Sequence, residues 1–263
     1  MLAQTLVIVL VSVLLSSAAA FRPLGRGVHR RGLGRLDSSA VDDKVEVEQY
    51  FNGEGFNRWN KIYSDSDEVN SVQMDIRNGH QQTIDKVLGW LSGEDNKGKT
   101  VCDAGCGTGS LALPMATMFK KVFASDISAA MTKEAGDRAK KVGLKNLEFK
   151  VSDMEKLNGK YDTVTCIDVM IHYPTDAMYG IVGHLGSLSN QRLILSFAPK
   201  NFFYDILKKV GELFPGKSKT TRAYLHPEED VVKALKQAGF TIKRTEMTST
   251  NFYFSRLLEA VRS

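Results

Sequence analysis

The sequence predicts an α/β fold with a mostly parallel, doubly wound sheet that carries one antiparallel strand. Beyond residue 99, strand-like apolar runs alternate with helix-like runs, which is typical of parallel sheets. Two further strand-like runs close the chain around the turn-like Ser249-Thr250-Asn251, which predicts a terminal hairpin. A glycine-rich turn, Gly105-Cys106-Gly107-Thr108-Gly109, directly follows the first strand-like run. Such a turn lets backbone N–H groups approach a ligand closely.

Composition bounds the class of protein. The 263 residues are 43% hydrophobic and 25% charged, an ordinary globular composition for one large α/β domain. The formal net charge of +5 comes from residues 1–36, which hold five arginines and no acid. Without these, 30 Lys and Arg residues balance 30 Asp and Glu residues. The chain beyond residue 36 is therefore formally neutral, and this charge balance does not favour nucleic-acid binding.

Residues 1–36 have the composition of a bipartite signal and transit presequence. The apolar run from Leu6 to Leu15 is too short to span a membrane, and small residues ending at Ala20 follow it. An arginine- and glycine-rich stretch begins after the expected cleavage site near Ala20–Phe21. This arrangement resembles the plastid presequences of algae with secondary plastids. Plain secretion is the alternative.

Three cysteines, Cys102, Cys106 and Cys166, bear on the compartment. Their number is odd, and no His or Cys pair lies nearby at zinc-ligand spacing, so neither a disulfide framework nor a metal site is expected. A reducing compartment such as a plastid stroma is therefore favoured over secretion.

The segment 37–98 is expected to form an N-terminal helical arm ahead of the domain over residues 99–263. Asp37 to about Glu48 is polar and is expected to be a linker that runs into a helix. Apolar residues from Val72 to Leu91 recur with a helical period.

In the domain itself we predict alternating strands and helices. The predicted strands are Thr100–Asp103, Lys121–Ser125, Leu147–Val151, Tyr161–Ile167, Arg192–Phe197, Thr241–Thr248 and Phe252–Arg262. The predicted helices are Ser110–Phe119, Ser128–Lys141, Asp176–Leu188 and Pro227–Gly239, the last with proline in its first turn and glycine at its C-cap.

The segment 200–226 breaks this alternation. Aromatic and apolar residues precede Pro215-Gly216 and a basic stretch. We expect an amphipathic helix and a basic loop, inserted after the fifth strand and above the carboxyl ends of the strands, where ligands bind in open α/β sheets. An ordinary amphipathic helix with a solvated basic face is the alternative.

Three acids, Asp103, Asp126 and Asp153, close the first three predicted strands. Asp103 suits a positively charged ligand, because it would repel a pyrophosphate. Asp126, about 20 residues beyond the glycine turn, can accept hydrogen bonds from both hydroxyls of a ribose. Asp153 can accept from an adenine amino group, and Met154 can pack on the ring. A helix N-cap is the alternative for each acid, although three acids in register with three strands make it weaker as a joint explanation.

The glycine turn and these acids resemble motifs I to III of the S-adenosylmethionine-dependent methyltransferases, and the terminal hairpin resembles their seven-stranded sheet. The resemblance implies a class I, Rossmann-like fold with S-adenosylmethionine as cofactor and S-adenosylhomocysteine as product. The cofactor-binding residues that it implies are Asp103, Gly105, Cys106, Gly107, Gly109, Asp126, Ile127, Asp153, Met154 and Asp168. Asp168 is either a ligand of the cofactor or an orienter of its loop.

The fourth predicted strand runs into a segment that ends in His172-Tyr173-Pro174. Amino-methylating enzymes place an N/D-P-P-Y/F tetrapeptide here, and its absence disfavours that chemistry. His172 is a base, a hydrogen-bond donor to the acceptor, or a satisfied structural residue.

Motifs that lie mostly outside the cofactor site resemble the magnesium-protoporphyrin IX methyltransferase family over residues 45–262. They are Gln49–Asn52, Arg58–Tyr63, Arg77–Thr83, Cys102–Gly107, Ile171–Pro174, Leu195–Lys200, Leu213–Gly216, Ser218–Tyr224 and Met247–Thr250. The resemblance implies an enzyme that esterifies one propionate of magnesium protoporphyrin IX during chlorophyll synthesis.

The resemblance also implies roles for particular residues. A propionate has a pKa of about 4.3 and is already ionised, so alignment and exclusion of water matter more than a strong base. Tyr63 and His172 are the implied catalytic residues, with core packing against Trp59 as the alternative for Tyr63. The implied substrate-binding residues supply aromatic walls and cations: Tyr173, Phe202, Phe203, Phe214, Lys219, Arg222 and Tyr224.

The presequence and the cysteines favour a plastid, whereas association with the large subunit of magnesium chelatase and peripheral contact with a plastid membrane are implied by the family alone. Two alternatives stay open: a methyltransferase of the same fold that acts on a quinone or phenol, and a non-enzymatic porphyrin carrier. The intact glycine turn and acids argue against the carrier.

Overall fold

A computed structural model describes residues 38–64, 66–200 and 223–263. The predicted presequence and most of the predicted insertion lie outside these residues. Among the described residues, no helix has the length and apolar character needed to cross a membrane.

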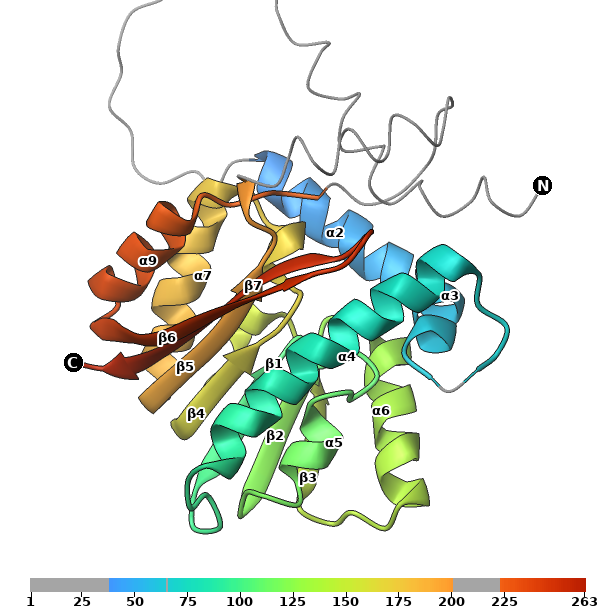
Figure 1. Cartoon of the computed structure of the whole chain (residues 1–263), viewed down its shortest axis with the longest axis horizontal. Helices are drawn as coiled ribbons and strands as arrows, with labels where there is room; N and C mark the ends of the chain where they lie inside the picture. Colours follow the sequence, from blue (N-terminus) through green and yellow to red (C-terminus); the bar gives the residue numbers. More distant parts are fainter. Residues whose placement is uncertain (1–37, 65, 201–222) are drawn as a thin grey trace, which may run out of the picture.

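Seven strands form one sheet in the order β3-β2-β1-β4-β5-β7-β6 (Figure 1). The strands are β1 (Thr100–Ala104), β2 (Lys121–Asp126), β3 (Leu147–Val151), β4 (Tyr161–Cys166), β5 (Ser189–Phe197), β6 (Phe240–Ser249) and β7 (Phe254–Arg262). β7 pairs in antiparallel fashion with both β5 and β6, and the other pairs are parallel. The predicted sheet with one antiparallel strand is therefore confirmed.

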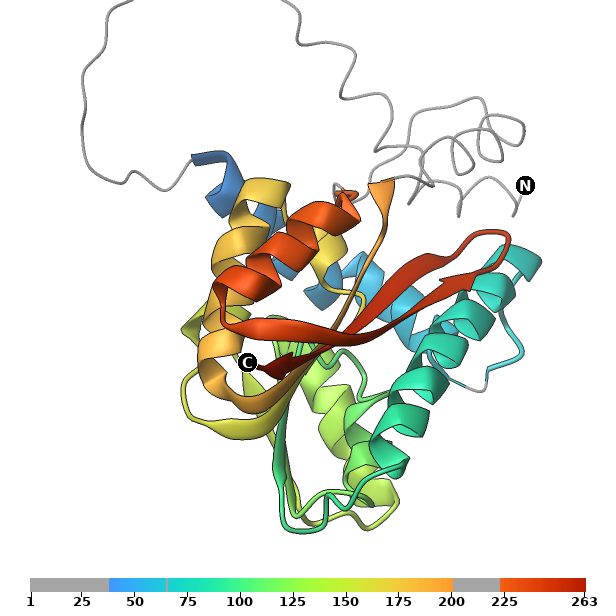
Figure 2. The same cartoon turned by 60° about the vertical axis from the view of Figure 1, so that its left-hand side comes forward.

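Helices cover both faces of the sheet (Figure 2). The α-helices are α2 (Ser38–Asn52), α3 (Glu54–Ile62), α4 (Ser71–Ser92), α5 (Ala112–Met115), α6 (Ala129–Lys141), α7 (Thr175–Leu188) and α9 (Glu228–Gln237). Two short 3₁₀ turns, η2 (Met154–Lys156) and η3 (Met170–His172), follow β3 and β4.

The strand period of two sorts side chains into two cores. On β1, Val101 belongs to the core under α4 and α5, whereas Cys102 and Ala104 belong to the core under α7 and α9. Leu193 and Ile194 of β5 divide in the same way. Strands buried on both faces account for the continuous apolar runs in the sequence.

Two local predictions were wrong. The predicted helix Ser110–Phe119 is regular only over α5, because Pro114 has no N–H and the backbone beyond it turns through i→i+3 bonds such as that from the Thr117 N–H to the Pro114 carbonyl, 3.1 Å. The polar stretch predicted as a linker up to Glu48 is helical from Ser38 onward. Its helix is held by tertiary contacts with α3, α6 and η3, which local sequence does not reveal.

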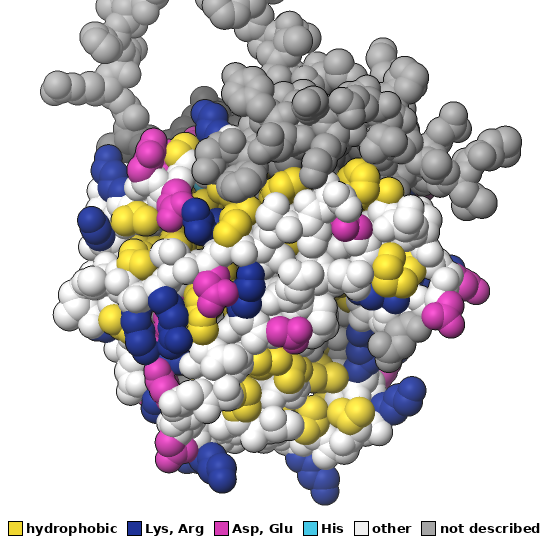
Figure 3. All heavy atoms as spheres, in the orientation of Figure 1, with side chains coloured by type: hydrophobic (Ala, Val, Ile, Leu, Met, Phe, Trp, Pro, Cys, Tyr) yellow, Lys and Arg dark blue, Asp and Glu magenta, His cyan; other side chains and the backbone are white. Residues whose placement is uncertain are grey.

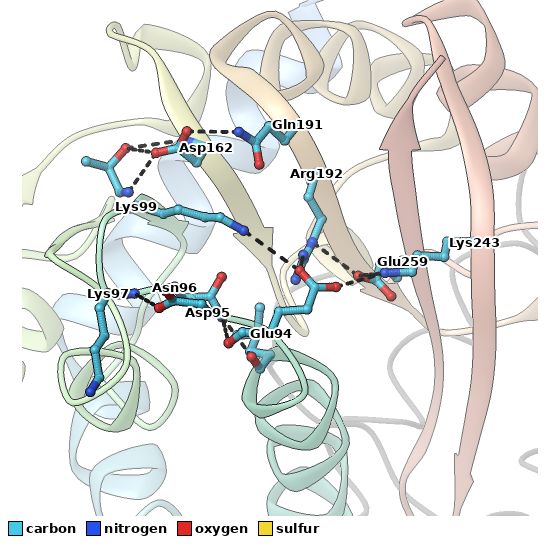
Figure 4. A network of polar contacts seen from close by, with 12 residues as sticks. Glu94, Asp95, Asn96, Lys97, Lys99, Asp162, Gln191, Arg192, Lys243 and Glu259 are labelled. Atoms are coloured by element: carbon cyan, nitrogen blue, oxygen red, sulfur yellow. Dashed lines mark hydrogen bonds and ion pairs between the residues drawn. The ribbon is translucent and has the colours of Figure 1, made fainter.

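A network of ion pairs joins the end of α4 to the sheet, at the end opposite the glycine turn (Figure 4). Glu94, just beyond α4, contacts Arg192 on β5 and Lys243 on β6. Arg192 Nε also lies 3.1 Å from Oε1 of the fully buried Glu259 on β7, which Arg244 contacts as well. Although burial opposes ionisation, hydrogen bonds from Lys243 and Arg192 lower the pKa of Glu94 to about 2.

Charges of both signs are interspersed on the face shown in Figure 3. This distribution agrees with the formally neutral composition of the chain beyond residue 36.

Candidate active site

One cavity lies at the carboxyl ends of β1, β2 and β4, where the strand order reverses. The loops after these strands form one wall. The arm α2–α4 and the turn between β6 and β7 close the other sides. Most of the lining is apolar or aromatic, which suits a ligand with a large unsaturated surface.

The glycine turn is held open by backbone geometry. Gly105, Gly107 and Gly109 have φ of +83°, +51° and +87°, a region that side chains disfavour. A Cβ on Gly105 would lie 2.3 Å from Cγ2 of Val169, whereas a Cβ on Gly107 would meet nothing within 4 Å. The turn therefore needs glycine at its first position and leaves room for a ligand at its second.

Asp126 is tied to this turn. Its Oδ2 accepts from the Gly107 N–H and its Oδ1 from the Ser128 N–H, both at 2.9 Å. Burial raises the pKa of Asp126 despite these hydrogen bonds. Ser128, not Asp126, is the N-cap of α6, because its side chain accepts from the Met131 N–H.

Asp103 is deeper in the site, 2% exposed, and accepts from Oγ1 of Thr165 at 2.7 Å. Burial, opposed by the Thr165 hydrogen bond and reinforced by the charge of Asp126, raises the pKa of Asp103 to about 7. A cation in the cavity would favour the ionised form of Asp103, and the sulfonium and ammonium groups of S-adenosylmethionine are such cations.

Asp153 is the N-cap of η2, as the alternative interpretation of this residue predicted. Its Oδ1 accepts from the Glu155 N–H at 3.0 Å, and its Oδ2 lies 3.3 Å from Nζ of Lys44 on α2. Ser152 and Met154 on either side line the cavity. The Asp153 carboxylate is thus engaged by the backbone and by Lys44, and its two neighbours, rather than Asp153, are the residues that line the cavity.

Tyr63 follows α3 and lines the cavity. Its ring packs on Trp59 and His80, with centroid separations of 5.3 and 4.2 Å. Arg77 holds the loop by donating to the carbonyls of Lys61, Ile62 and Ser66 at 2.7–2.9 Å. Burial and the charge of Asp168 raise the pKa of Tyr63 well above its usual value, so its hydroxyl stays protonated.

His172 lies at the end of η3 and lines the same cavity as Tyr63. The structure records no hydrogen bond or ion pair between these two side chains. The ring of Phe51 on α2 packs edge-on against His172 with a centroid separation of 5.3 Å. Burial lowers the pKa of His172 to about 4, so the imidazole is neutral at physiological pH. Its Nδ1 has no hydrogen-bond partner among the described residues.

The predicted substrate residues divide into two groups. Tyr173 is buried and lines the cavity. Tyr224 donates from its hydroxyl to Oδ2 of Asp43 on α2 at 2.6 Å, and its neighbours Ala223 and Leu225 line the cavity. The others lie outside the described residues: Phe202, Phe203, Phe214, Lys219 and Arg222.

Sequence reasoning missed a polar network centred on Asp168. This residue has a φ of +59°, and its carboxylate accepts hydrogen bonds from four side chains: His80, Ser196, Tyr253 and Ser255. Both oxygens of the Asp168 carboxylate are engaged inside the protein, which favours the orienter alternative over a side-chain ligand of the cofactor. The Arg77–Thr83 motif is the sequence feature that could have indicated this network, because it contains His80.

The sheet order, the terminal hairpin and the glycine turn with its acids define a class I S-adenosylmethionine-dependent methyltransferase. Residues 95–198 match the general family described as "Methyltransferase domain". Residues 166–262 match the family described as "Magnesium-protoporphyrin IX methyltransferase C-terminus".

Curated relatives extend this likeness over most of the chain. A magnesium protoporphyrin IX methyltransferase of Arabidopsis thaliana, described as chloroplastic, is 56% identical over 223 residues, which are 83% of this chain and 71% of the relative. A magnesium-protoporphyrin O-methyltransferase of Synechocystis is 54% identical over 231 residues, 87% of this chain and 100% of the relative. The chain belongs to the magnesium-protoporphyrin IX methyltransferase family.

A solved structure agrees with the fold. The crystal structure of the Synechocystis PCC 6803 enzyme with bound SAH superposes with a TM-score of 0.75 at 53% identity, and the match covers 84% of this chain and all of that one.

Proposed function

We propose that this chain transfers the methyl group of S-adenosylmethionine to a propionate of magnesium protoporphyrin IX and forms the monomethyl ester. Family membership at 54–56% identity supports the substrate. One observation on the site carries the mechanism: the glycine turn, Tyr63 and His172 line a single, largely apolar cavity. A flat macrocycle and the cofactor can therefore meet in one water-poor space.

The reaction needs no proton transfer. A carboxylate oxygen forms a bond to the methyl carbon, the carbon–sulfur bond breaks, and its electron pair remains on sulfur. The products are a neutral ester and S-adenosylhomocysteine. Because the propionate is ionised above about pH 4.3, the protein contributes mainly alignment and exclusion of water.

His172 and Tyr63 are suited to that contribution. A neutral imidazole can donate one hydrogen bond to the propionate without cancelling its charge, so the carboxylate keeps its nucleophilicity. The low pKa of His172 keeps it in this neutral form. The protonated Tyr63 hydroxyl, on a loop whose carbonyls accept hydrogen bonds from Arg77, supplies a second positioning group.

The cofactor fits the remaining wall. The backbone of the glycine turn would hold its methionine part, Asp126 would hold its ribose, and Met154 would pack on its adenine ring. Because Asp126 also accepts a hydrogen bond from the Gly107 N–H, ribose binding and the shape of the glycine turn are coupled.

The proposal extends to location and partners. The presequence composition and the chloroplastic relative favour a plastid, and we propose a stromal enzyme at the surface of a plastid membrane that meets the chelatase large subunit. Import of the full chain into isolated plastids, with a version that starts at residue 37 as the control, tests the location.

The activity is tested with the chain from residue 37, S-adenosylmethionine and magnesium protoporphyrin IX. We expect the monomethyl ester by chromatography. His172→Ala should lower turnover by at least about tenfold while S-adenosylmethionine affinity stays within about twofold, because the histidine positions the acceptor only. Cofactor binding without ester would favour a carrier, and methylation of a quinone or phenol instead would favour the other alternative.

A further inference from the structure

His80 is the member of the Arg77–Thr83 motif that the proposed function leaves without a role. It lies on α4, is only 8% exposed and lines the cavity. The neighbouring Gly79 lets α4 approach the ring of Tyr253, because a Cβ there would lie 2.5 Å from that ring. The backbone thus brings His80 and Tyr253 to the same carboxylate, that of Asp168.

The hydrogen bonds around Asp168 assign the tautomer of His80. Nδ1 of His80 lies 2.8 Å from Oδ2 of Asp168, and the Tyr253 hydroxyl donates to the same oxygen at 2.7 Å. Burial favours the acid form of Asp168, but the hydrogen bonds from His80, Tyr253 and Ser196 outweigh it and lower the pKa of Asp168. An ionised carboxylate only accepts, so Nδ1 carries a hydrogen and donates.

The other ring nitrogen of His80 has no partner. Nε2 is inaccessible to water and makes no hydrogen bond among the described residues. Two further ring nitrogens on the cavity lining, Nε1 of Trp59 and Nδ1 of His172, are in the same state. Leaving buried polar atoms unpaired costs stability, so three of them around one cavity point to a polar group of a ligand.

The charges around the cavity limit how a ligand carboxylate can be held there. The described lining residues include Asp103, Asp126 and Asp168 but no Lys or Arg. A proton on Nε2 makes His80 a cation, and the Asp168 carboxylate in contact with Nδ1 stabilises that cation. The titratable groups that face the imidazole are Asp168, Asp103, Tyr63 and Tyr253, of which two are carboxylates.

We propose that His80, oriented by Asp168, binds a ligand carboxylate through a hydrogen bond donated by Nε2–H. Asp168 is the positioning residue, and His80 touches the ligand. The inference rests on the proposed function, which places two carboxylates in the cavity: that of the methionine part of the cofactor and that of the substrate propionate. The same chemistry serves either source, and binding experiments separate them.

The decisive variant is His80→Asn. The asparagine amide takes the place of Nδ1 and keeps a donor for Asp168, but it removes Nε2. His184→Asn is the matched control, because Nε2 of His184 is also buried and unpaired but belongs to α7, away from the cavity lining. Calorimetry compares S-adenosylhomocysteine with its decarboxylated analogue. Fluorescence titration compares magnesium protoporphyrin IX with its dimethyl ester.

We expect His80→Asn to weaken one carboxylate-bearing ligand by about ten- to a hundredfold, the range for a charge-assisted hydrogen bond, and to leave its carboxylate-free counterpart within about twofold. Loss with S-adenosylhomocysteine assigns His80 to the cofactor, and loss with the free porphyrin assigns it to the propionate. Equal effects on both members of each pair, or no effect on either pair, would overturn the inference.

The wild-type protein gives a second test that needs no buried substitution. Nitrogen-15 spectra of the ring assigned to His80 through contacts with Tyr63 should show a protonated, exchange-protected Nε2 with a carboxylate-bearing ligand and not with its carboxylate-free counterpart. An unprotonated Nε2 in every complex would also overturn the inference. Neither test measures turnover, so a wild-type protein that binds these ligands but forms no ester would refute the proposed function alone.

Discussion

Asp103 gives the sharpest prediction, because the structure sets its sign and its size. The carboxylate is buried, and its pKa is raised from 3.8 to about 7. The folded protein therefore binds a proton that the unfolded chain has already lost, and stability falls as the pH rises from about 4 to about 7. Asp103→Asn mimics the protonated acid and escapes this loss.

The magnitude follows from the two pKa values. One pKa unit corresponds to about 1.4 kcal/mol, so the ionised carboxylate costs about 2 kcal/mol of folding free energy at pH 5 and about 4 kcal/mol at pH 8. Asp103→Asn should thus gain about 2–3 kcal/mol relative to the native chain between these pH values. The comparison across pH cancels any constant effect of the substitution on packing.

Urea denaturation without cofactor at pH 5, 6.5 and 8 measures this difference. Asp85→Asn, an exposed acid on α4, is the control and should show no such trend. Asp103→Asn should also weaken S-adenosylmethionine binding by about tenfold or more, because the cation loses its buried counter-charge. A stability difference that stays flat from pH 5 to pH 8 would refute the reasoning.

Three further substitutions test other parts of the structure. Gly105→Ala would press a Cβ against Val169 in a left-handed backbone. We expect calorimetry to show a loss of S-adenosylmethionine affinity of about tenfold or more. Unchanged affinity would contradict the proposal that the glycine turn holds the cofactor. Glu259→Gln removes the buried negative charge that Arg192 and Arg244 share and leaves Arg192 with Glu94 alone, so it should cost about 1–3 kcal/mol in urea denaturation, with turnover of the folded protein unchanged because the network lies at the far end of the sheet. Arg77→Lys cannot bridge three carbonyls and should lower kcat by about tenfold while cofactor affinity is retained; an equal loss of both would show a structural role.

The fold was largely predictable because its signals are local. Val101 and Cys102 face opposite cores as the strand period requires, and Pro227 and Gly239 mark the ends of α9 as expected. Local signals failed where packing decides. Pro114 confined a predicted helix to α5, and the polar segment before residue 48 is helical through its contacts with α3, α6 and η3.

The site divides in the same way. The glycine turn and Asp126 were identifiable from spacing, because the chain brings them to neighbouring parallel strands at one edge of the sheet. Asp153 was predicted equally well by an N-cap, and its bond to the Glu155 N–H shows that geometry. The roles of Tyr63 and His172 remain predictions, although both line the cavity.

The order of strands and helices, the positions that require glycine and the family can all be inferred from the amino-acid sequence. Each depends on neighbouring residues, through a side-chain period, a backbone angle or a contiguous motif. Which polar atoms find a hydrogen-bond partner depends instead on the folded chain. Both carboxylate oxygens of Asp168 accept hydrogen bonds, and His80, 88 residues away in sequence, keeps one ring nitrogen that no described residue bonds. A hydrogen bond between two such residues exists only once the chain has closed around both, so no local pattern records which atom is left for the ligand.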